Sequence, residues 1–372
     1  MMKNYKVILV SPFPPPYGGI ASYSDNLING LIDNNIDVEA YDTSRFDYLR
    51  IHNPDKKRNY LRIFNPLNFG FVFMMLFDYS YFFLKIIFKR NLIIHIHTSS
   101  FFGWWRSILY AIISKILRKK TILHVHNAID RFYLQESGVI GKFLIKGSMR
   151  IPDNIISLSH GIKNLLSELT NTPIKPIYNG IDIEQFKPDK KYIKPYKMLF
   201  AGFVGPQKGV PDLLEALKDT KLDTSEIQLT VMGDGDLIDM REFANSIGID
   251  NMVTFTGRVS EQEKTKLFNS HHILVLPSYG EGQPISILEG MASKMAIIST
   301  KVGSISEIIK KENGILVDPG DIKELSNAIL YLVKEENLGQ IGKKNREAAS
   351  KSFTFERVVE DNIFNYEQVL DY

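Results

Sequence analysis

The amino-acid sequence predicts an α/β protein of two domains, each built on a parallel β-sheet covered by helices. Apolar segments of strand length alternate with helical patterns through both halves of the chain, which favours parallel strands joined by helical crossovers. The chain has 372 residues, enough for two complete hydrophobic cores. A charged segment with prolines and no apolar period, residues 186–195, indicates the linker between them.

We expect a strand wherever a short apolar run ends before a loop. In the first half these runs are residues 6–10, 38–41, 92–97, 121–126, 154–158 and 176–178. In the second half they are residues 198–203, 228–232, 253–256, 273–276, 296–299 and 315–317. We therefore predict a first domain at residues 1–190 and a second at residues 191–353. Open α/β sheets bind ligands at the carboxyl ends of their strands, so functional residues are expected in the loops that follow them.

The composition excludes several classes of site. The chain has no cysteine, so it lacks disulfides, thiolate metal sites and cysteine nucleophiles, and it fits a reducing compartment. No Walker phosphate loop and no serine nucleophile elbow are present. The apolar stretch near the N-terminus ends at Pro12 without a small-residue cleavage site, so we interpret it as the first strand rather than a signal peptide.

The net charge of +3 conceals an uneven distribution. Residues 1–190 carry 24 Lys and Arg against 15 Asp and Glu, whereas residues 191–372 carry 21 against 27. A basic first half favours an anionic partner such as a membrane surface or a phosphorylated lipid. A solvated surface of uneven charge is the alternative. Because no recognition motif accompanies the basic residues, we expect no nucleic acid.

The longest apolar stretch, residues 67–88, approaches the ~20 residues that a membrane-spanning helix needs. Asp78 and Lys85 interrupt it, and charges near the middle of a span are costly in lipid. We predict a long, mostly buried helix, or one that rests an aromatic face on the membrane interface, rather than a span.

The most informative feature of the second half is a pair of carboxylates, Glu281 and Glu289, that follows the apolar run at residues 272–277. Between them Pro284 suits the first turn of a helix, where free N–H groups attract phosphate. A carboxylate deeper in such a helix can accept two hydrogen bonds from a vicinal diol such as a ribose. Phosphate and diol together indicate a nucleotide-sugar site.

A lysine stands in another loop of the same half. Lys208 lies in the glycine-containing segment at residues 202–209, between a strand and a helix. A cation held there can neutralise a departing diphosphate, an electrostatic role that is strongest where water is excluded. A solvent-exposed lysine in a glycine turn is the alternative.

Two further glycine loops are less specific. Gly18 and Gly19 follow a proline run after the first strand, where backbone can approach a ligand, although a simple tight turn has the same sequence. Asp234 and Asp236 form an Asp-x-Asp pair between glycines that could hold a cation between phosphates. We interpret this pair as a turn followed by a capping aspartate at a helix start.

Four histidines end two apolar strands of the first half, His95 with His97 and His124 with His126. Strand alternation places the members of each pair on one face. Because no carboxylate or cysteine nearby completes a ligand set, we predict hydrogen bonding to backbone or substrate rather than metal binding. His126, which precedes a polar loop, is the best candidate of the four for substrate contact.

Taken together, these motifs make the chain similar to glycosyltransferase family 4, the retaining group 1 glycosyltransferases of the GT-B fold. The resemblance runs almost end to end. It includes the glycine loop at residues 17–20, the segment Ile177-Tyr178-Asn179-Gly180-Ile181-Asp182, Lys208-Gly209, the block at residues 281–292, the segments at residues 297–300 and 302–308, and Asn313-Gly314-Ile315-Leu316-Val317.

The resemblance implies two Rossmann-like domains facing across a cleft, the first of which the C-terminal helix at residues 354–372 would complete. Glu289 would hold the ribose, Lys208 the diphosphate, and Glu281 the transferred sugar. The resemblance implies catalytic residues Lys208, Glu281 and His126, and donor-binding residues Gly19, Arg258, Val259, Gly282, Gln283, Ile285 and Glu289.

The implied activity is transfer of a hexose or N-acetylhexosamine from a nucleotide diphosphate sugar to a hydroxyl, with retention of configuration. No cofactor and no metal would be needed. The acceptor would be a glycan, most naturally a lipid-linked one in surface polysaccharide biosynthesis. We expect a cytoplasmic protein in peripheral contact with the anionic inner face of the plasma membrane.

One residue departs from the family pattern. Phe203 follows Gly202, where the family commonly has an arginine that partners the lysine. Loss of one charged hydrogen-bond donor would weaken diphosphate stabilisation by ~1.5–3 kcal/mol. Two alternatives therefore stay open: a non-catalytic subunit that binds sugar nucleotides, and a GT-B-like nucleotide-sugar epimerase.

Overall fold

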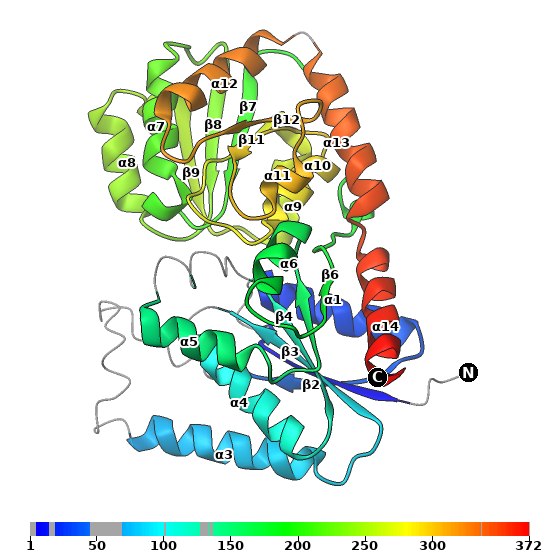
Figure 1. Ribbon diagram of the computed structural model, residues 1–372. Helices are drawn as coiled ribbons and strands as arrows, with labels where there is room; N and C mark the ends of the chain where they lie inside the picture. The colour runs from blue at the N-terminus through cyan, green and yellow to red at the C-terminus, as the bar shows by residue number, and fades with distance from the viewer. Residues whose placement is uncertain are drawn as a thin grey trace. The chain divides into compact units, whose positions relative to one another are not determined.

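The computed structural model describes residues 5–14, 19–44, 69–99, 102–126, 133, 137–335 and 337–371, without the side chains of residues 69–72. The chain divides into two compact units (Figure 1). Unit 1 contains Met1–Ile177 and Val359–Tyr372, and unit 2 contains Tyr178–Val358. The first division therefore lies upstream of the boundary that the sequence predicts at residue 190.

Unit 1 is built on a six-stranded parallel sheet of order β2-β1-β3-β4-β5-β6. Its strands are β1 (Lys6–Ser11), β2 (Asp37–Asp42), β3 (Leu92–Thr98), β4 (Lys120–Val125), β5 (Asn154–Ser157) and β6 (Ile174–Pro176). Its helices are α1 (Gly19–Asp33), α3 (Phe69–Ile86), α4 (Phe102–Ile116), α5 (Val139–Ser148), α6 (His160–Ser167) and most of α14 (Phe355–Asp371).

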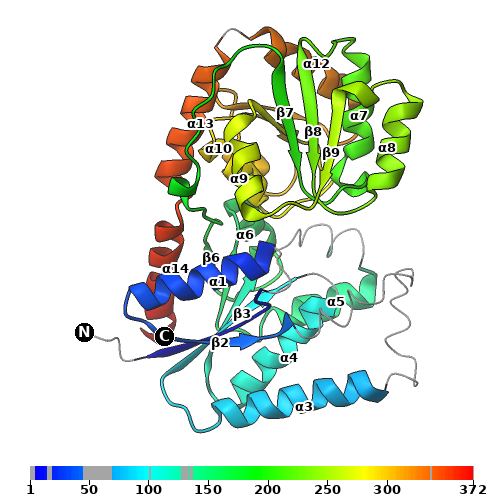
Figure 2. The same ribbon diagram turned by 180° about the vertical axis from the view of Figure 1, so that it is seen from behind.

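Alternate residues of the central strands meet different helices. Ile94 and Ile96 of β3 belong to the same hydrophobic cluster as Phe82 of α3 and Trp104 of α4. His95 lies between them in the sequence, and its Nδ1 is hydrogen-bonded to the hydroxyl of Tyr366 in α14 at 2.8 Å. Figures 1 and 2 show α3, α4 and α5 as neighbours, with α1 and α14 set apart from them. The period of two in a strand thus sends the apolar and the histidine side chains to opposite faces.

Unit 2 has its own six-stranded parallel sheet, of order β12-β11-β10-β7-β8-β9. Its strands are β7 (Tyr196–Ala201), β8 (Ile227–Met232), β9 (Val253–Gly257), β10 (Ile273–Leu276), β11 (Ala296–Thr300) and β12 (Gly314–Val317). Its helices are α7 (Val210–Asp219), α8 (Leu237–Ser246), α9 (Glu261–Ser270), α10 (Ile285–Ala292), α11 (Ile305–Ile308), α12 (Ile322–Lys334) and α13 (Leu338–Ser352), with short 3-10 turns η4 (Ile183–Gln185), η5 (Pro206–Lys208) and η6 (Asp250–Met252).

The prediction of an α/β protein with two parallel sheets is confirmed, and all twelve predicted strands are present within a few residues of their expected ends. The segment predicted as a linker, residues 186–195, contributes to unit 2. Phe186 is fully buried in the core of that unit, and Lys190 donates to the carbonyl oxygens of Phe268 and His271. A charge run can cap carbonyl groups at a helix end as well as face solvent, and composition does not distinguish the two.

The apolar stretch at residues 67–88 forms α3, as expected, but it is not mostly buried. Phe82 and Ile86 are fully buried, whereas Phe77 and Leu84 are 64% and 67% exposed. Among the described residues no helix is both long and apolar enough to span a membrane.

We predict that Tyr366→Ala destabilises unit 1 by about 3–5 kcal/mol, since it empties a fully buried aromatic site. The tyrosine ring also packs edge-on against Tyr5. Both tryptophans of the chain lie in α4, so tryptophan fluorescence during urea unfolding reports unit 1. Phe364→Ala is the matched control because that ring is 50% exposed on the same helix, and it should cost less than about 1 kcal/mol. Equal losses in the two variants would contradict a structural role for Tyr366.

Candidate active site

A lysine and a carboxylate meet at the end of β10 in unit 2. Lys208 is the last residue of η5, and its Nζ lies 2.5 Å from Oε1 of Glu281. Ser278 Oγ donates to the same carboxylate oxygen at 2.7 Å. The two residues that the sequence places in separate loops are therefore in direct contact.

The backbone around Gly209 explains this contact. Gly209 has φ of +69°, and a Cβ there would overlap the carbonyl oxygen of Pro277. Only glycine allows the loop after β7 to lie so close to the end of β10. The amide of Tyr279 also donates to the carbonyl oxygen of Gln207 at 3.1 Å, which joins the two loops just before Lys208.

The loop that carries Glu281 is held against the start of α11. Gly303 has φ of +54°, and a side chain there would overlap the carbonyl oxygens of Glu281 and Gly282. Ser304 donates to the Gly282 carbonyl oxygen from its amide at 2.9 Å and from Oγ at 2.8 Å. The backbone at Glu281 and Gly282 is therefore held in place by the segment at Gly303 and Ser304.

Helix α10 begins at Ile285, and Pro284 is its N-cap rather than its first residue as the sequence predicted. No side chain among the described residues caps this end. The first N–H groups of any α-helix lack partners within the helix, so this end can accept an anion.

Gln283 lies directly before this end and is buried. Its Oε1 accepts from the Asn179 amide at 2.5 Å, and its carbonyl oxygen accepts from Asn179 Nδ2 at 3.0 Å. Its Nε2 is buried without a hydrogen-bond partner among the described residues. An unpaired buried donor is costly, and a ligand oxygen would satisfy it.

Glu289, inside α10, is 8% exposed and pairs with a lysine that the sequence analysis did not single out. Lys264 Nζ lies 2.9 Å from Glu289 Oε1 and 2.7 Å from Glu261 Oε2. Burial acts to lower the pKa of Lys264, but the carboxylates of Glu289 and Glu261 outweigh it and raise that pKa above its ordinary value. The capping box between Ser260 and Glu263 holds the start of α9, which carries the lysine.

The remaining predicted donor residues of unit 2 lie at strand and helix ends. Arg258, just after β9, is exposed and lies 3.6 Å from Asp234 Oδ2, which follows β8. Val259 and Ile285 are half-buried and pack on the core of unit 2. Phe203, at the position of the expected arginine, is 53% exposed.

The glycine turn at residues 233–236 follows the predicted pattern in part. Asp236 occupies the N-cap position of α8, as expected, but its side chain makes no capping hydrogen bond. The backbone forms the contacts instead, because the Val204 amide donates to the Asp234 carbonyl oxygen at 2.7 Å and the Asp236 amide donates to the Val204 carbonyl oxygen at 2.8 Å.

In unit 1 the four histidines form one cluster around Tyr23 of α1. The ring of Tyr23 lies 5.4 Å from those of His97 and His124 and 4.9 Å from that of His126, between ring centroids. His124 and His126 are stacked with centroids 4.0 Å apart. The structure thus joins the two strand-end pairs that the sequence predicted separately.

Burial keeps these histidines neutral. It lowers the pKa of His95 to about 3, with a further contribution from His126, and burial alone lowers the pKa of His126 to about 3. Burial, followed by the neighbouring histidines, holds the pKa of His97 and His124 well below the ordinary value. None of the four carries charge at neutral pH.

Three of the histidines are close enough to hold a metal ion, since ligand nitrogens of His95, His97 and His124 lie within 4.8 Å of one another. Several of their nitrogens already have protein partners. His97 Nδ1 lies 2.9 Å from Ser24 Oγ, and His95 Nε2 lies 3.2 Å from His124 Nδ1. These partners are side chains, whereas the sequence predicted backbone or substrate, and Nε2 of His97 and Nε2 of His124 are buried without a hydrogen-bond partner among the described residues. The prediction that the cluster binds no metal stays a prediction.

Gly19 is the first residue of α1 and lies at the surface of unit 1. Tyr17 and Gly18, which belong to the same predicted loop, lie outside the described residues, as does the segment at residues 127–130 that follows His126.

Two family models match the chain in succession. The model described as Glycosyltransferase Family 4 matches residues 17–185, and the one described as Glycosyl transferases group 1 matches residues 182–351. Together they span both units. The chain belongs to the group 1 glycosyltransferases of the family 4 type.

Individual proteins resemble this glycosyltransferase at modest identity. The uncharacterized glycosyltransferase MJ1178 of Methanocaldococcus jannaschii is 29% identical over 98% of this chain and 99% of its own length. The O-antigen chain mannosyltransferase RfbU of Salmonella typhimurium is 28% identical over 58% of this chain and 61% of its own. The structure of Anabaena Alr3699/HepE in complex with UDP matches with a TM-score of 0.74 at 17% identity, over 98% of this chain and 100% of that chain. This likeness confirms the GT-B fold.

The sequence motifs named the candidate residues of the glycosyltransferase, but they did not identify the side chains that contact those residues. Lys264 was missed because nothing in α9 distinguishes it from a solvent-exposed lysine. Ser278 and Asn179 were not assigned a role, although Asn179 stands in a quoted motif. These three contact Glu289, Glu281 and Gln283 respectively. Gly19 and His126 belong to unit 1, and the other predicted site residues belong to unit 2.

We expect Gly209→Ala to displace Lys208 and to destabilise unit 2. A left-handed conformation alone costs a non-glycine residue about 1–2 kcal/mol. Gly248→Ala is the matched control, since Gly248 has φ of +75° and nothing within 4 Å of its added Cβ. The free energy of unfolding should fall further for Gly209→Ala, because a backbone carbonyl cannot easily move away. Equal losses would show that the loop accommodates a methyl group.

The histidine cluster should make unit 1 sensitive to acid. The folded state resists protonation of these side chains, whereas the unfolded chain binds protons near the ordinary pKa of 6.5. The stability from each neutral histidine is thus present above pH 6.5 and is lost as pH falls toward its folded pKa. Each contributes a slope of about 1.4 kcal/mol per pH unit in that window.

Urea unfolding followed by tryptophan fluorescence between pH 7 and pH 5 measures this slope for unit 1. His124→Gln should lower the slope by about one proton, or 1.4 kcal/mol per pH unit. Identical slopes in the wild type and His124→Gln would contradict a neutral buried cluster.

Proposed function

We propose that this glycosyltransferase moves a hexose or N-acetylhexosamine from a nucleotide diphosphate sugar to a hydroxyl group, with retention of anomeric configuration. The observation that carries the proposal is the contact of Lys208 with Glu281 at 2.5 Å, beside the uncapped start of α10. A cation, a helix end and a carboxylate in one loop cluster suit a sugar joined to a diphosphate.

Each part of the cluster has a role in binding the donor. Lys208 and the first amides of α10 would bind the diphosphate, and Glu289 would accept hydrogen bonds from the ribose. Glu281 and the free Nε2 of Gln283 would address the transferred sugar. Arg258 and Val259 would lie beside the base. His126 would contact the sugar, and Gly19 the donor phosphate or the acceptor.

In the proposed reaction, the bond between the anomeric carbon and the phosphate oxygen breaks, and its electron pair stays on the diphosphate. Lys208 and the helix end stabilise the developing charge there. The acceptor oxygen bonds to the anomeric carbon from the same face, and its proton passes to an oxygen of the leaving phosphate. No separate general base and no metal cofactor are needed.

We propose a lipid-linked glycan as the acceptor, in the assembly of a surface polysaccharide. The mannosyltransferase RfbU, which builds an O-antigen chain, supports this class of acceptor. The excess of Lys and Arg in residues 1–190 supports contact with an anionic membrane. The enzyme would act in the cytoplasm, peripheral on the inner face of the plasma membrane.

A second candidate is a non-catalytic subunit that binds sugar nucleotides, and Phe203 favours it. Its ring is 53% exposed where the family commonly has an arginine, so one cation of the diphosphate site is replaced. Purified protein incubated with a panel of nucleotide sugars and membrane extract separates the two. Release of nucleoside diphosphate that depends on the extract supports transfer. Binding of the nucleotide sugar without release supports the non-catalytic subunit.

We predict that Lys208→Ala lowers turnover by about 10²–10³-fold with the fold intact, the usual effect of removing one group that stabilises transition-state charge. Lys218→Ala is the matched control, because Lys218 is an exposed lysine in the last turn of the adjacent helix α7. Nucleoside diphosphate release measures both variants, and circular dichroism checks their folding. Near-normal turnover in Lys208→Ala would remove the lysine from the leaving-group role.

A further inference from the structure

Helix α3 has the reverse of the usual polarity of a surface helix, with its charged side chains facing the protein and its apolar side chains facing outward. Its two charged side chains point inward: Asp78 is 3% exposed, and Lys85 pairs with Glu39 of β2 at 2.5 Å. Asp78 accepts hydrogen bonds from the hydroxyls of Tyr41, at 3.0 Å, and Tyr110. The core of unit 1 satisfies Asp78, and the partly exposed Glu39 on the edge strand β2 pairs with Lys85, which leaves no charged side chain of α3 among the exposed residues of its outer side.

The outer side of α3 is apolar along its described length except at Ser80, whose hydroxyl donates to the Leu76 carbonyl oxygen. Phe73, Leu76, Phe77, Tyr81 and Leu84 are all exposed, and Phe88 just beyond the helix is 90% exposed. Their spacing of three and four residues places them on one stripe. A helix on the surface of a protein in water normally shows the reverse pattern.

The two neighbouring helices extend this surface. Trp105, Leu109 and Ile116 are exposed on α4, and Val139, Ile140, Phe143 and Leu144 are exposed on α5. With those of α3, they make thirteen of the twenty large hydrophobic side chains that are exposed among the described residues. We call these thirteen residues the apolar face of unit 1. Single exposed hydrophobic residues are ordinary, whereas a contiguous group marks a binding surface.

Contacts between the helices hold the apolar face together. The hydroxyl of Tyr79 in α3 donates to the Arg106 carbonyl oxygen in α4 at 3.4 Å. The indole Nε1 of Trp104 in α4 donates to Ser148 Oγ in α5 at 3.0 Å. Figures 1 and 2 agree that the three helices lie side by side.

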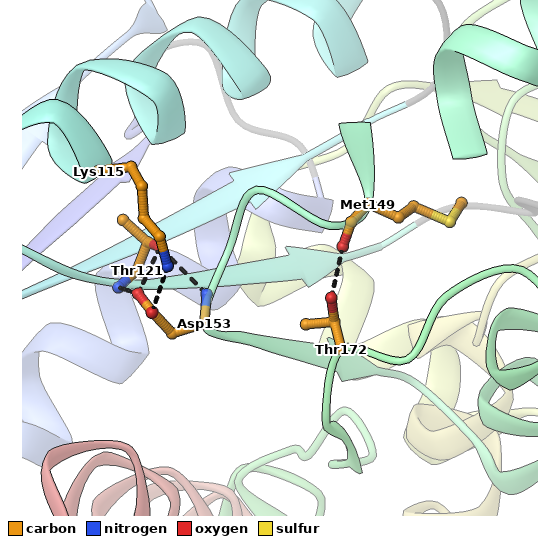
Figure 3. Close-up of polar contacts among 5 residues, drawn as sticks. All are labelled: Lys115, Thr121, Met149, Asp153 and Thr172. Carbon is orange, nitrogen blue, oxygen red and sulfur yellow. Dashed lines mark hydrogen bonds and ion pairs between the residues drawn. The ribbon is translucent and has the colours of Figure 1, made fainter. Parts of the chain in front are cut away.

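The end of α5 is also tied to the sheet (Figure 3). Asp153 Oδ2 accepts from the Thr121 amide at 2.8 Å, and Asp153 Oδ1 lies 2.6 Å from Lys115 Nζ. Thr172 Oγ1 donates to the Met149 carbonyl oxygen at 2.9 Å. These contacts hold the C-terminal end of α5, where Ile145 and Ser148 are buried.

The charge around the apolar face is mostly positive. Residues 69–99, 102–126 and 137–151, which contain α3, α4 and α5, carry eleven Lys and Arg residues and one acid, the buried Asp78. Three of these cations are paired with acids outside the three segments, Lys85 and Lys89 with Glu39 and Lys115 with Asp153. Arg90, Lys146 and Arg150 are among the exposed cations. An apolar surface with an excess of exposed cations is complementary to anionic lipid headgroups over hydrocarbon.

We propose that the apolar face of unit 1 binds the surface of an anionic lipid bilayer, with the side chains of α3, α4 and α5 inserted at the interface and no helix spanning it. A second copy of the chain is a poorer partner, because a symmetric contact would bring the same cations together. The proposal deepens the proposed function by naming the surface that would meet a lipid-linked acceptor. Binding is measured without substrate, so it can fail or succeed independently of turnover.

Vesicle sedimentation tests the proposal on the full chain. The wild type should bind vesicles of equal parts phosphatidylcholine and phosphatidylglycerol, and should bind pure phosphatidylcholine much more weakly. The triple variant Phe73→Ser, Phe77→Ser and Leu84→Ser should lose at least about tenfold in partition coefficient, because it removes three inserted apolar side chains. The double variant Arg90→Gln and Lys146→Gln should lose binding most strongly at low salt.

A matched triple variant in unit 2, Ile193→Ser, Ile238→Ser and Tyr331→Ser, replaces equally exposed hydrophobic residues and should bind as the wild type does. Trp105 lies on the apolar face and Trp104 is buried, so a lipid-borne quencher should reduce the fluorescence of wild type but not of Trp105→Phe.

Three outcomes would overturn the proposal. Equal vesicle binding by the wild type and the α3 triple variant would place the contact elsewhere. Concentration-dependent dimers that the triple variant abolishes, without vesicle binding, would assign the face to a second copy. A large fall in melting temperature for the triple variant would show that the face is covered within the monomer.

Discussion

The parallel sheet of unit 1 is buried on both faces, and this constraint organises the unit. Each central strand must supply side chains to two different helical layers, with a period of two. One layer, α3 with α4 and α5, receives isoleucine and leucine residues, whereas α1 and α14 receive His95, His97 and His124. Because those imidazoles are buried, they remain neutral and hydrogen-bonded, which couples the stability of the unit to pH.

The same constraint accounts for the unusual surface of α3. A helix that packs on an apolar sheet face usually directs its charges outward, but Asp78 is hydrogen-bonded to the buried Tyr41 and Tyr110, and Lys85 pairs with Glu39 on the edge strand β2. The outward stripe is then free to be apolar. Tyr81 of the stripe stacks on Tyr41, whereas Phe73, Phe77 and Phe88 are mostly exposed. In the proposed contact these phenylalanines would be buried in an anionic bilayer.

In unit 2 the loops of the candidate site are held together by close contacts between backbone segments at glycine residues. Gly209 lies against Pro277, and Gly303 lies against the loop of Glu281. These contacts fix the cation of Lys208 and the start of α10 within one small region. In the proposed reaction, preorganised charge of this kind would stabilise the leaving group without reorganisation. Lys264 adds a second cation beside Glu289, in a unit where Phe203 replaces the customary arginine.

The sequence by itself determined the fold class, the twelve strands and the loops that contain Lys208 and Glu281, because strand period, glycine positions and the spacing of Glu281 and Glu289 are local properties of the chain. Only the tertiary structure decided which distant groups meet. The pairing of Lys264 with Glu289, the capping role of Lys190 and the clustering of two histidine pairs depend on contacts between separate elements. The exposure of the α3 stripe was equally undecided by sequence, since an apolar segment with two charges can bury either side, and the positions of Tyr41, Tyr110 and Glu39 selected the one that faces inward.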